Sequence, residues 1–165
     1  MASFLEIKVD HIDNDSIKVI DGVGNEVTYD VLGDLRVDDY NANTELKFQH
    51  SKYRRYADIF TRITYYLEEA EVELSAIGSR INLDVRNKYL NATKKQPTQD
   101  IVNSEIQSRE EYIEQQKKVN QLKYQKQQLQ YILKAFEQRK DMLVQYTAHL
   151  RKDIEHGTMD WKTKM

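Results

Sequence analysis

The feature that most constrains this sequence is a seven-residue repeat of apolar side chains over residues 119–150. The repeat consists of Leu122, Leu129, Phe136, Leu143 and Leu150, with Val119 and Leu133 each three residues before a member of that series. The run contains no Gly or Pro, and strong helix formers dominate it. Because such a repeat keeps one apolar stripe facing a partner helix, this segment predicts half of a long helix pair.

The repeat has three flaws, at Lys126, Lys140 and Thr147, where apolar residues are expected. A polar side chain in the seam leaves part of the stripe without an apolar contact. The flanking residues expected to compensate are Ile132, Val144 and Tyr146.

A second apolar series predicts the other long helix. Its members follow alternating steps of three and four: Leu46, Gln49, Tyr53, Tyr56, Phe60, Ile63, Leu67, Ala70, Leu74, Ile77 and Ile81. Asn43 is a suitable N-cap, and Glu45 places an acid in the first turn. We therefore expect a helix from about Asn43 to about Asn91.

The only proline, Pro97, marks the break between the two helices, because proline cannot occupy a helix interior. Thr98 can cap a short helix after it, and Ser108 with Glu111 can form the capping box of the second long helix. That helix should stop at Gly157. With the midpoint of the fold-back near residue 100, Ile81 is expected to face Val119.

The first 40 residues have a different pattern. Leu5, Ile7 and Val9 alternate with polar residues, and residues 16–20 and 26–31 are β-prone runs separated by a segment with two glycines. The predicted fold is therefore mainly α, a long antiparallel helical hairpin (coiled-coil-like) with a small N-terminal β-hairpin head. The expected divisions are an acidic β-rich head at 1–40, a helical hairpin at 41–157 with a connector at 92–107, and a flexible tail at 158–165.

A single hairpin of this length buries only one stripe of each helix. A second apolar stripe must then be buried by another contact. Its members are Ile59, Tyr66 and Val72 on the first helix, with Ile132 and Tyr146 on the second. We expect a homo-oligomer, or docking on another protein.

Several classes of function are disfavoured by what the chain contains. There is no cysteine, no signal peptide pattern and no apolar run long enough to cross a membrane, which favours a cytoplasmic protein without membrane contact. Gly22 and Gly24 are not followed by a helix with Lys-Ser/Thr, so no phosphate loop is expected. The face that carries His149, Asp153 and His156 favours an exposed polar surface over a metal site. We expect no enzyme, no cofactor and no metal.

The distribution of charge is more informative. Residues 1–43 hold ten acidic and three basic residues, a net of −7, whereas the remaining residues hold 22 basic and 17 acidic ones, a net of +5. From residue 115 to residue 140 one acid, Glu137, accompanies seven bases: Lys117, Lys118, Lys123, Lys126, Lys134, Arg139 and Lys140. Such a segment favours an anionic partner, with solvated helix faces as the alternative.

In the folded-back chain, the early part of this basic run is expected beside Arg80, Arg86 and Lys88, with Lys94 and Lys95 in the connector. Tyr124 and Tyr131 are seven residues apart and share the face opposite the seam. Basic groups that follow a backbone, with aromatic rings for stacking, are what sequence-tolerant binding of single-stranded DNA requires. The alternative is that both tyrosines pack on a neighbouring subunit and the lysines are solvated.

Two stretches of the sequence resemble phage recombination mediator proteins of the UvsY type. One is Val37-Asp-Asp-Tyr-Asn-Ala-Asn-Thr-Glu-Leu46, followed by His50-Ser-Lys-Tyr53 and a long charged helix. The other is the Tyr112 region with Ala135-Phe-Glu-Gln-Arg-Lys140. The resemblance covers roughly residues 36–155.

Members of this family are helical, form ring-like oligomers and bind single-stranded DNA. The resemblance implies that the chain helps to load a RecA-like recombinase onto strands coated by single-strand-binding protein. It also implies DNA contacts late in the first long helix, at Arg80, Arg86 and Lys88.

The sequence therefore predicts a non-enzymatic, oligomeric single-stranded-DNA-binding accessory protein of recombination or replication, which acts in the host cytoplasm if the chain is phage-encoded. The alternative is a coiled-coil structural or assembly protein of a phage particle. A third hypothesis is an adaptor or inhibitor that docks on a host enzyme.

Overall fold

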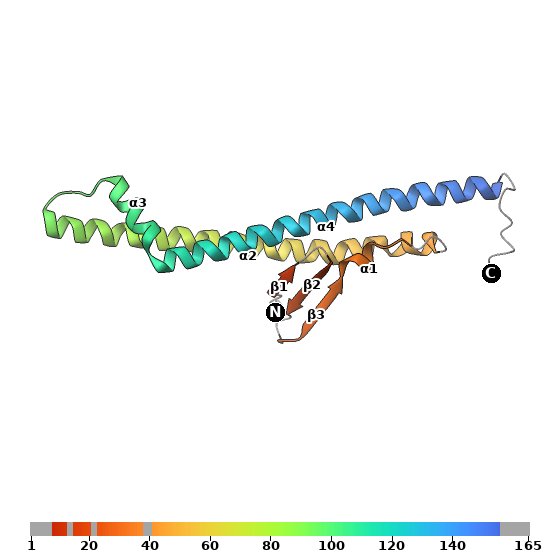
Figure 1. Cartoon of the computed structure of the whole chain (residues 1–165), viewed down its shortest axis with the longest axis horizontal. Helices are drawn as coiled ribbons and strands as arrows, with labels where there is room; N and C mark the ends of the chain where they lie inside the picture. Colours follow the sequence, from red (N-terminus) through yellow and green to blue (C-terminus); the bar gives the residue numbers. More distant parts are fainter. Residues whose placement is uncertain (1–7, 13–14, 21–22, 38–40, 156–165) are drawn as a thin grey trace, which may run out of the picture. The chain divides into compact units, whose positions relative to one another are not determined.

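The computed structural model describes residues 8–12, 15–20, 23–37 and 41–155, and it confirms the predicted mainly helical fold with a small β head (Figure 1). Its elements are β1 (Lys8–Ile12), β2 (Ser16–Ile20), β3 (Glu26–Asp30), α1 (Val31–Leu35), α2 (Ala42–Thr93), α3 (Gln99–Ser108) and α4 (Glu110–Glu155). The chain divides into two compact units, the first made of residues 1–61 and 127–165, the second of residues 62–126. Leu5, Ile7, Gly157 and the predicted tail at 158–165 lie outside the described residues.

The head of the first unit is a three-stranded antiparallel sheet in the order β1-β2-β3. In β2, Ile17 and Val19 are buried and alternate with partly exposed neighbours, as expected for a strand with one covered face. The turn between β2 and β3 contains Gly24 at φ 90°, a conformation that favours glycine. The sequence did not predict α1, a single turn that Asp30 caps by accepting a hydrogen bond from the Gly33 amide at 2.8 Å.

Tyr56 of α2 joins the head to both long helices. Its fully buried ring stacks on Phe136 of α4, with centroids 4.9 Å apart, and meets the Tyr29 ring of β3 edge-on at 6.4 Å. The guanidinium of Arg55 lies 5.0 Å from the centroid of the Tyr29 ring. These contacts fix the sheet on α2 within the first unit.

Arg139 is buried beside this aromatic group, so it is not available to the anionic partner that the basic run over residues 115–140 predicts. Its guanidinium donates to the carbonyl oxygens of Leu35 at 3.1 Å and Arg36 at 3.0 Å, and also to the side chains of Gln49 and Glu45. Buried Gln49 in turn donates to the Phe136 carbonyl at 2.7 Å. Gln49, the one polar residue in the predicted α2 series, is therefore part of the core.

The predicted series of α4 is confirmed at Val119, Leu129, Phe136 and Leu143, which are buried, but three buried residues between them lie one position before the predicted ones. Gln125, Ile132 and Arg139 are buried, whereas Lys126 and Leu133 are only partly buried and Lys140 is exposed. Both stripes alternate steps of three and four, and the order of the steps decides which residue faces inward. Lys126 and Lys140 are thus no flaws of the seam, and Val144 does not complete it because it is exposed.

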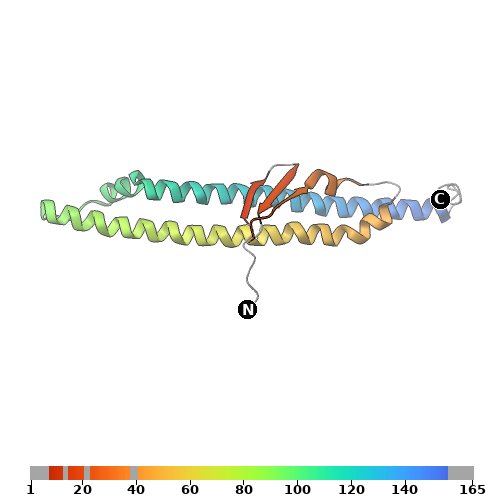
Figure 2. The same ribbon diagram turned by 90° about the horizontal axis from the view of Figure 1, so that it is seen from below.

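In the second unit, α3 and α4 pack on the later part of α2. Leu67 and Ala70 form one apolar cluster with Val119, against which Leu74 and Leu122 pack. Ile81, Val85 and Val102 form another, with Ile77, Ile106 and Tyr112 around it. In both views the green α3 lies alongside the end of α2 (Figures 1 and 2).

The predicted pairing of Ile81 with Val119 is wrong, because Val119 packs on Leu67 and Ala70 instead. The chain turns between Thr93 and Gln99, earlier than expected, and α3 already runs back along α2. Thr98 caps α3 as predicted.

The predicted capping box of the second long helix is not formed. Ser108 ends α3 and donates to the Glu105 carbonyl at 2.9 Å, whereas α4 starts at Glu110. The two helices are instead separated by Arg109, which has extended backbone.

Candidate nucleic-acid interface

The end of the second unit is built by a tight reversal of the backbone after α2. Lys94 has φ 58°, in the left-handed region, and its amide donates to the Leu90 carbonyl at 2.8 Å. The Thr93 hydroxyl donates to the Tyr89 carbonyl at 2.8 Å and accepts from the Lys95 amide at 3.3 Å. Pro97 is buried, and the Thr98 hydroxyl accepts from the Ile101 amide. The reversal leaves the side chains of Lys94 and Lys95 exposed.

Three cations at this end, Arg86, Lys94 and Lys95, form what we term the turn cluster. Arg86 donates to the amide oxygens of Asn82 at 2.7 Å and Gln99 at 2.8 Å, which orient the guanidinium without neutralising it. Among the described residues, no member of the cluster has a carboxylate partner. The turn cluster is therefore open to an anion.

The other predicted cations of α2 are paired with acids. Lys88 lies 2.8 Å from the Asp84 carboxylate, which Arg109 also approaches at 3.5 Å. Arg80 forms an ion pair with Glu111 of α4. Pairs as exposed as these contribute about 0–1 kcal/mol, so a phosphate could replace the carboxylate, but each pair lowers the local positive potential.

The lysines of α4 are not at the turn, contrary to the predicted convergence. Lys118 lies 3.7 Å from Glu73, and Lys123 lies 2.8 Å from Glu71, so both face α2 well before its end. Glu73 precedes Arg86 by 13 residues, about 20 Å along the helix. The reason is the early turn, which shifts the register of α4 against α2. Lys117 is exposed and has no carboxylate partner among the described residues.

Tyr124 and Tyr131 are both more than half exposed, as predicted for the face opposite the seam. The Tyr131 hydroxyl accepts from the Gln127 side chain at 3.0 Å. Tyr124 belongs to the second unit and Tyr131 to the first. Each ring offers an open face on which a base could stack.

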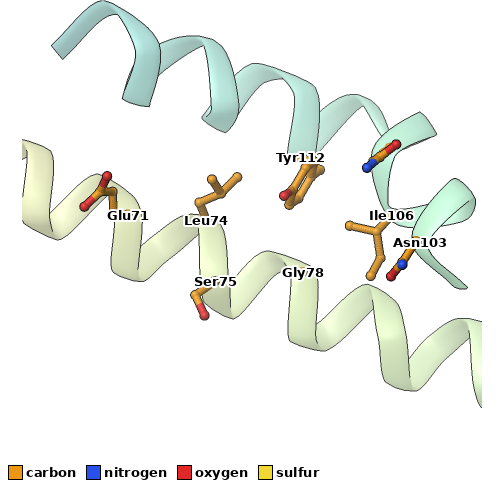
Figure 3. Close-up of a pocket in the computed structure, with 8 residues that line it drawn as sticks. Glu71, Leu74, Ser75, Gly78, Asn103, Ile106 and Tyr112 are labelled. Carbon is orange, nitrogen blue, oxygen red and sulfur yellow. The ribbon is translucent and has the colours of Figure 1, made fainter. Parts of the chain in front are cut away.

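A shallow groove of the second unit lies between α2, α3 and the start of α4 (Figure 3). Its lining residues are Glu71, Leu74, Ser75, Gly78, Asn103, Ile106, Gln107 and Tyr112. The one carboxylate among them, on Glu71, is the partner of Lys123, and Tyr112 belongs to the apolar cluster around Val102. The groove is a seam between helices, and none of its lining side chains is a base that could act together with Glu71.

The polar group around Asp34 in the first unit was missed from the sequence. Asp34 accepts from the Tyr56 hydroxyl at 2.9 Å and from Arg55 at 3.2 Å, and it lies 3.7 Å from Lys52. Burial and the bonded Asp34 carboxylate together raise the pKa of the Tyr56 hydroxyl above its ordinary range. Every buried side-chain polar atom in the described residues has a hydrogen-bond partner, and this group holds α1 on α2.

His156, one of the three residues of the metal hypothesis, lies outside the described residues. Among the residues that the structure describes, no three His, Asp or Glu side chains come together to hold an ion. None of the described helices is both long enough and apolar enough to cross a bilayer. No protein family, curated protein or solved structure matches this chain.

Proposed function

We propose that this chain is a non-enzymatic accessory protein that binds single-stranded DNA and acts as a homo-oligomer in recombination or replication. The observation that carries the proposal is the turn cluster of Arg86, Lys94 and Lys95. These cations lie at one end of the second unit and have no carboxylate partner among the described residues. Cations of this kind release counterions when they meet phosphates, which drives sequence-independent binding.

The exposed tyrosines favour a single strand over a duplex. A ring such as that of Tyr124 can stack only on a base that is not already stacked in a helix. Lys117, seven residues before it on α4, supplies a further cation on the same face. A strand could thus use phosphate and base contacts together.

The mediator role in this proposal comes from the UvsY-type resemblance. In that role the chain loads a recombinase onto strands held by single-strand-binding protein, in the host cytoplasm of an infected cell. Each subunit offers few phosphate contacts, and an oligomer multiplies them through effective concentration.

The proposal is tested by fluorescence anisotropy with labelled oligothymidine at low salt. The double variant Lys94→Gln, Lys95→Gln should bind at least tenfold more weakly. A matched variant with Lys47→Gln and Arg54→Gln removes the same charge from exposed positions of the first unit, and its affinity should stay within about twofold. Equal losses in both variants, or no binding by the native chain, would refute the proposal.

A second candidate is a coiled-coil structural or assembly protein of a phage particle. The pairing of Lys118 and Lys123 with acids of α2 favours it, because paired lysines are ordinary solvated surface. The exposed apolar side chain of Val72 favours it too. This candidate predicts stable assembly in solution together with no affinity for oligothymidine.

A further inference from the structure

One face of α2 in the second unit carries large apolar side chains that are open to solvent. Tyr65, Val72, Leu83 and Leu90 are 56%, 71%, 64% and 39% exposed. At about 100° per residue, these four positions fall within about 20° of one another around the helix. The inward-facing residues Ile63 and Ile81 lie on the opposite side. We call this face the outer stripe of α2.

The spacing of the outer stripe is the same in both directions along the helix. Ala76 and Ser79, also exposed, belong to this face and give steps of seven, four, three, four and seven from Tyr65 to Leu90. A two-fold axis midway between Ala76 and Ser79 would therefore place Tyr65 opposite Leu90 and Val72 opposite Leu83. A self-complementary patch of this kind is what a two-fold dimer contact requires.

The charges at one edge of the stripe match the same arrangement. Glu68 and Arg86 lie on the same edge, nearly equidistant from the centre, and neither has a partner of opposite charge among the described residues. In an antiparallel pair, Glu68 of each copy would face Arg86 of the other, which gives two ion pairs. In a parallel pair, Glu68 would instead face Glu69 of the second copy, and like charges would repel.

The small side chains lie where two such helices would come closest. Ala76 and Ser79 flank the centre, so the backbones can approach to about 8–10 Å, while the larger residues pack on either side. We propose that the outer stripe of α2 is the contact surface for a second copy of this chain, packed antiparallel about a two-fold axis. This contact involves protein only and holds whether or not the chain binds DNA.

Cysteine cross-linking tests the arrangement, because the chain has no cysteine of its own. Val72→Cys protein mixed with Leu83→Cys protein should give a cross-linked dimer with a short bis-maleimide. Neither variant alone should cross-link. In an antiparallel pair, Val72 of one copy and Val72 of the other are offset by 11 residues along the helix axis, about 16 Å, and the same holds for Leu83. Cross-linking of Val72→Cys with itself, or none in the mixture, would overturn the proposal. Gln121→Cys, exposed on α4, is the control and should not cross-link with either variant.

Charge reversal provides an independent test, read as mass by sedimentation without DNA. Glu68→Arg or Arg86→Glu alone should raise the dissociation constant of the dimer at least tenfold, and the double variant should restore it. Glu114→Arg, an exposed change on α4, should have no effect. If the double variant dimerised as weakly as the single variants, the antiparallel pairing would be overturned. Because Lys94 and Lys95 follow the end of α2, their substitution tests DNA binding separately from this contact.

Discussion

At Arg139 one buried side chain joins three elements, because its guanidinium on α4 donates to Leu35 and Arg36 at the end of α1 and to Glu45 on α2. Arg139→Met keeps much of the volume but leaves these acceptors without a donor. We expect the free energy of unfolding to fall by about 3 kcal/mol, measured by urea titration. Lys140→Met is the matched control, since Lys140 is exposed, and should change stability by less than about 0.5 kcal/mol. Equal losses would contradict the assignment of Arg139 to the core.

Tyr56 makes stability depend on alkaline pH. Its pKa in the folded chain is raised, by burial first and by Asp34 second. The stability it contributes is therefore fully present below the ordinary tyrosine pKa of about 10 and is lost as pH rises through the higher folded value. Tyr56→Phe should lower the free energy of unfolding by about 1 kcal/mol at neutral pH. Above pH 10 the variant should lose less of its stability than the native protein does, and urea titrations across pH measure both effects. A parallel pH dependence in the two proteins would contradict this.

The same residues show what the sequence can and cannot reveal about single positions. The α2 series from Leu46 to Ile81 is confirmed, since every member is buried or partly buried. Gln125, Ile132 and Arg139 do recur at steps of seven, which is the signal that could have found the true stripe of α4. Two of these three are polar, however, and an apolar pattern cannot recognise a buried arginine whose partners lie about 100 residues away. Of the predicted second stripe, Ile59 and Ile132 are buried and only Val72 is largely exposed.

The turn after α2 contains a local strain that a substitution can relieve. Lys94 has φ 58°, which costs a residue with a Cβ roughly 1 kcal/mol and costs glycine almost nothing. Lys94→Gly should therefore raise the free energy of unfolding by about 1 kcal/mol, measured by thermal or urea unfolding. Lys94→Ala removes the same charge but keeps the strain, so it should bring no gain. If the two variants were equally stable, the left-handed conformation of Lys94 would be contradicted.

The elements themselves were predictable, but their pairing was not. A capping threonine and a proline identified α3 and the break, because both act within a few residues. The register of α4 on α2 depends on where the chain reverses, and a shift of that point moves every pair. Lys118 and Lys123 therefore meet Glu73 and Glu71 rather than the turn. Heptads repeat along both helices, so many registers satisfy the apolar pattern equally well.

For the whole molecule, the net charge counted from the sequence overstates how many cations are available to bind an anion. The chain after residue 43 has a net of +5, yet lysines such as Lys88 and Lys123 are already paired with acids. Ion pairing depends on which helix faces meet, so it follows from the fold and not from composition. Four cations of the second unit have no carboxylate partner among the described residues: Arg86, Lys94, Lys95 and Lys117.

This difference between counted and available charge can be measured as a salt dependence. If Lys94, Lys95 and Lys117 alone contact a single strand, while Arg86 pairs with Glu68 of the second copy, the slope of log K against log salt should be about −2 per protomer, at roughly −0.7 per phosphate. Lys94→Gln should make the slope shallower by about 0.7, whereas Lys88→Gln, which removes a cation already paired with Asp84, should change it little. A slope near −6, with Lys88 and Lys94 equally important, would mean that the paired cations leave their carboxylates for phosphate. The contact would then extend well beyond the turn, along the whole paired surface of α2 and α4 in the second unit.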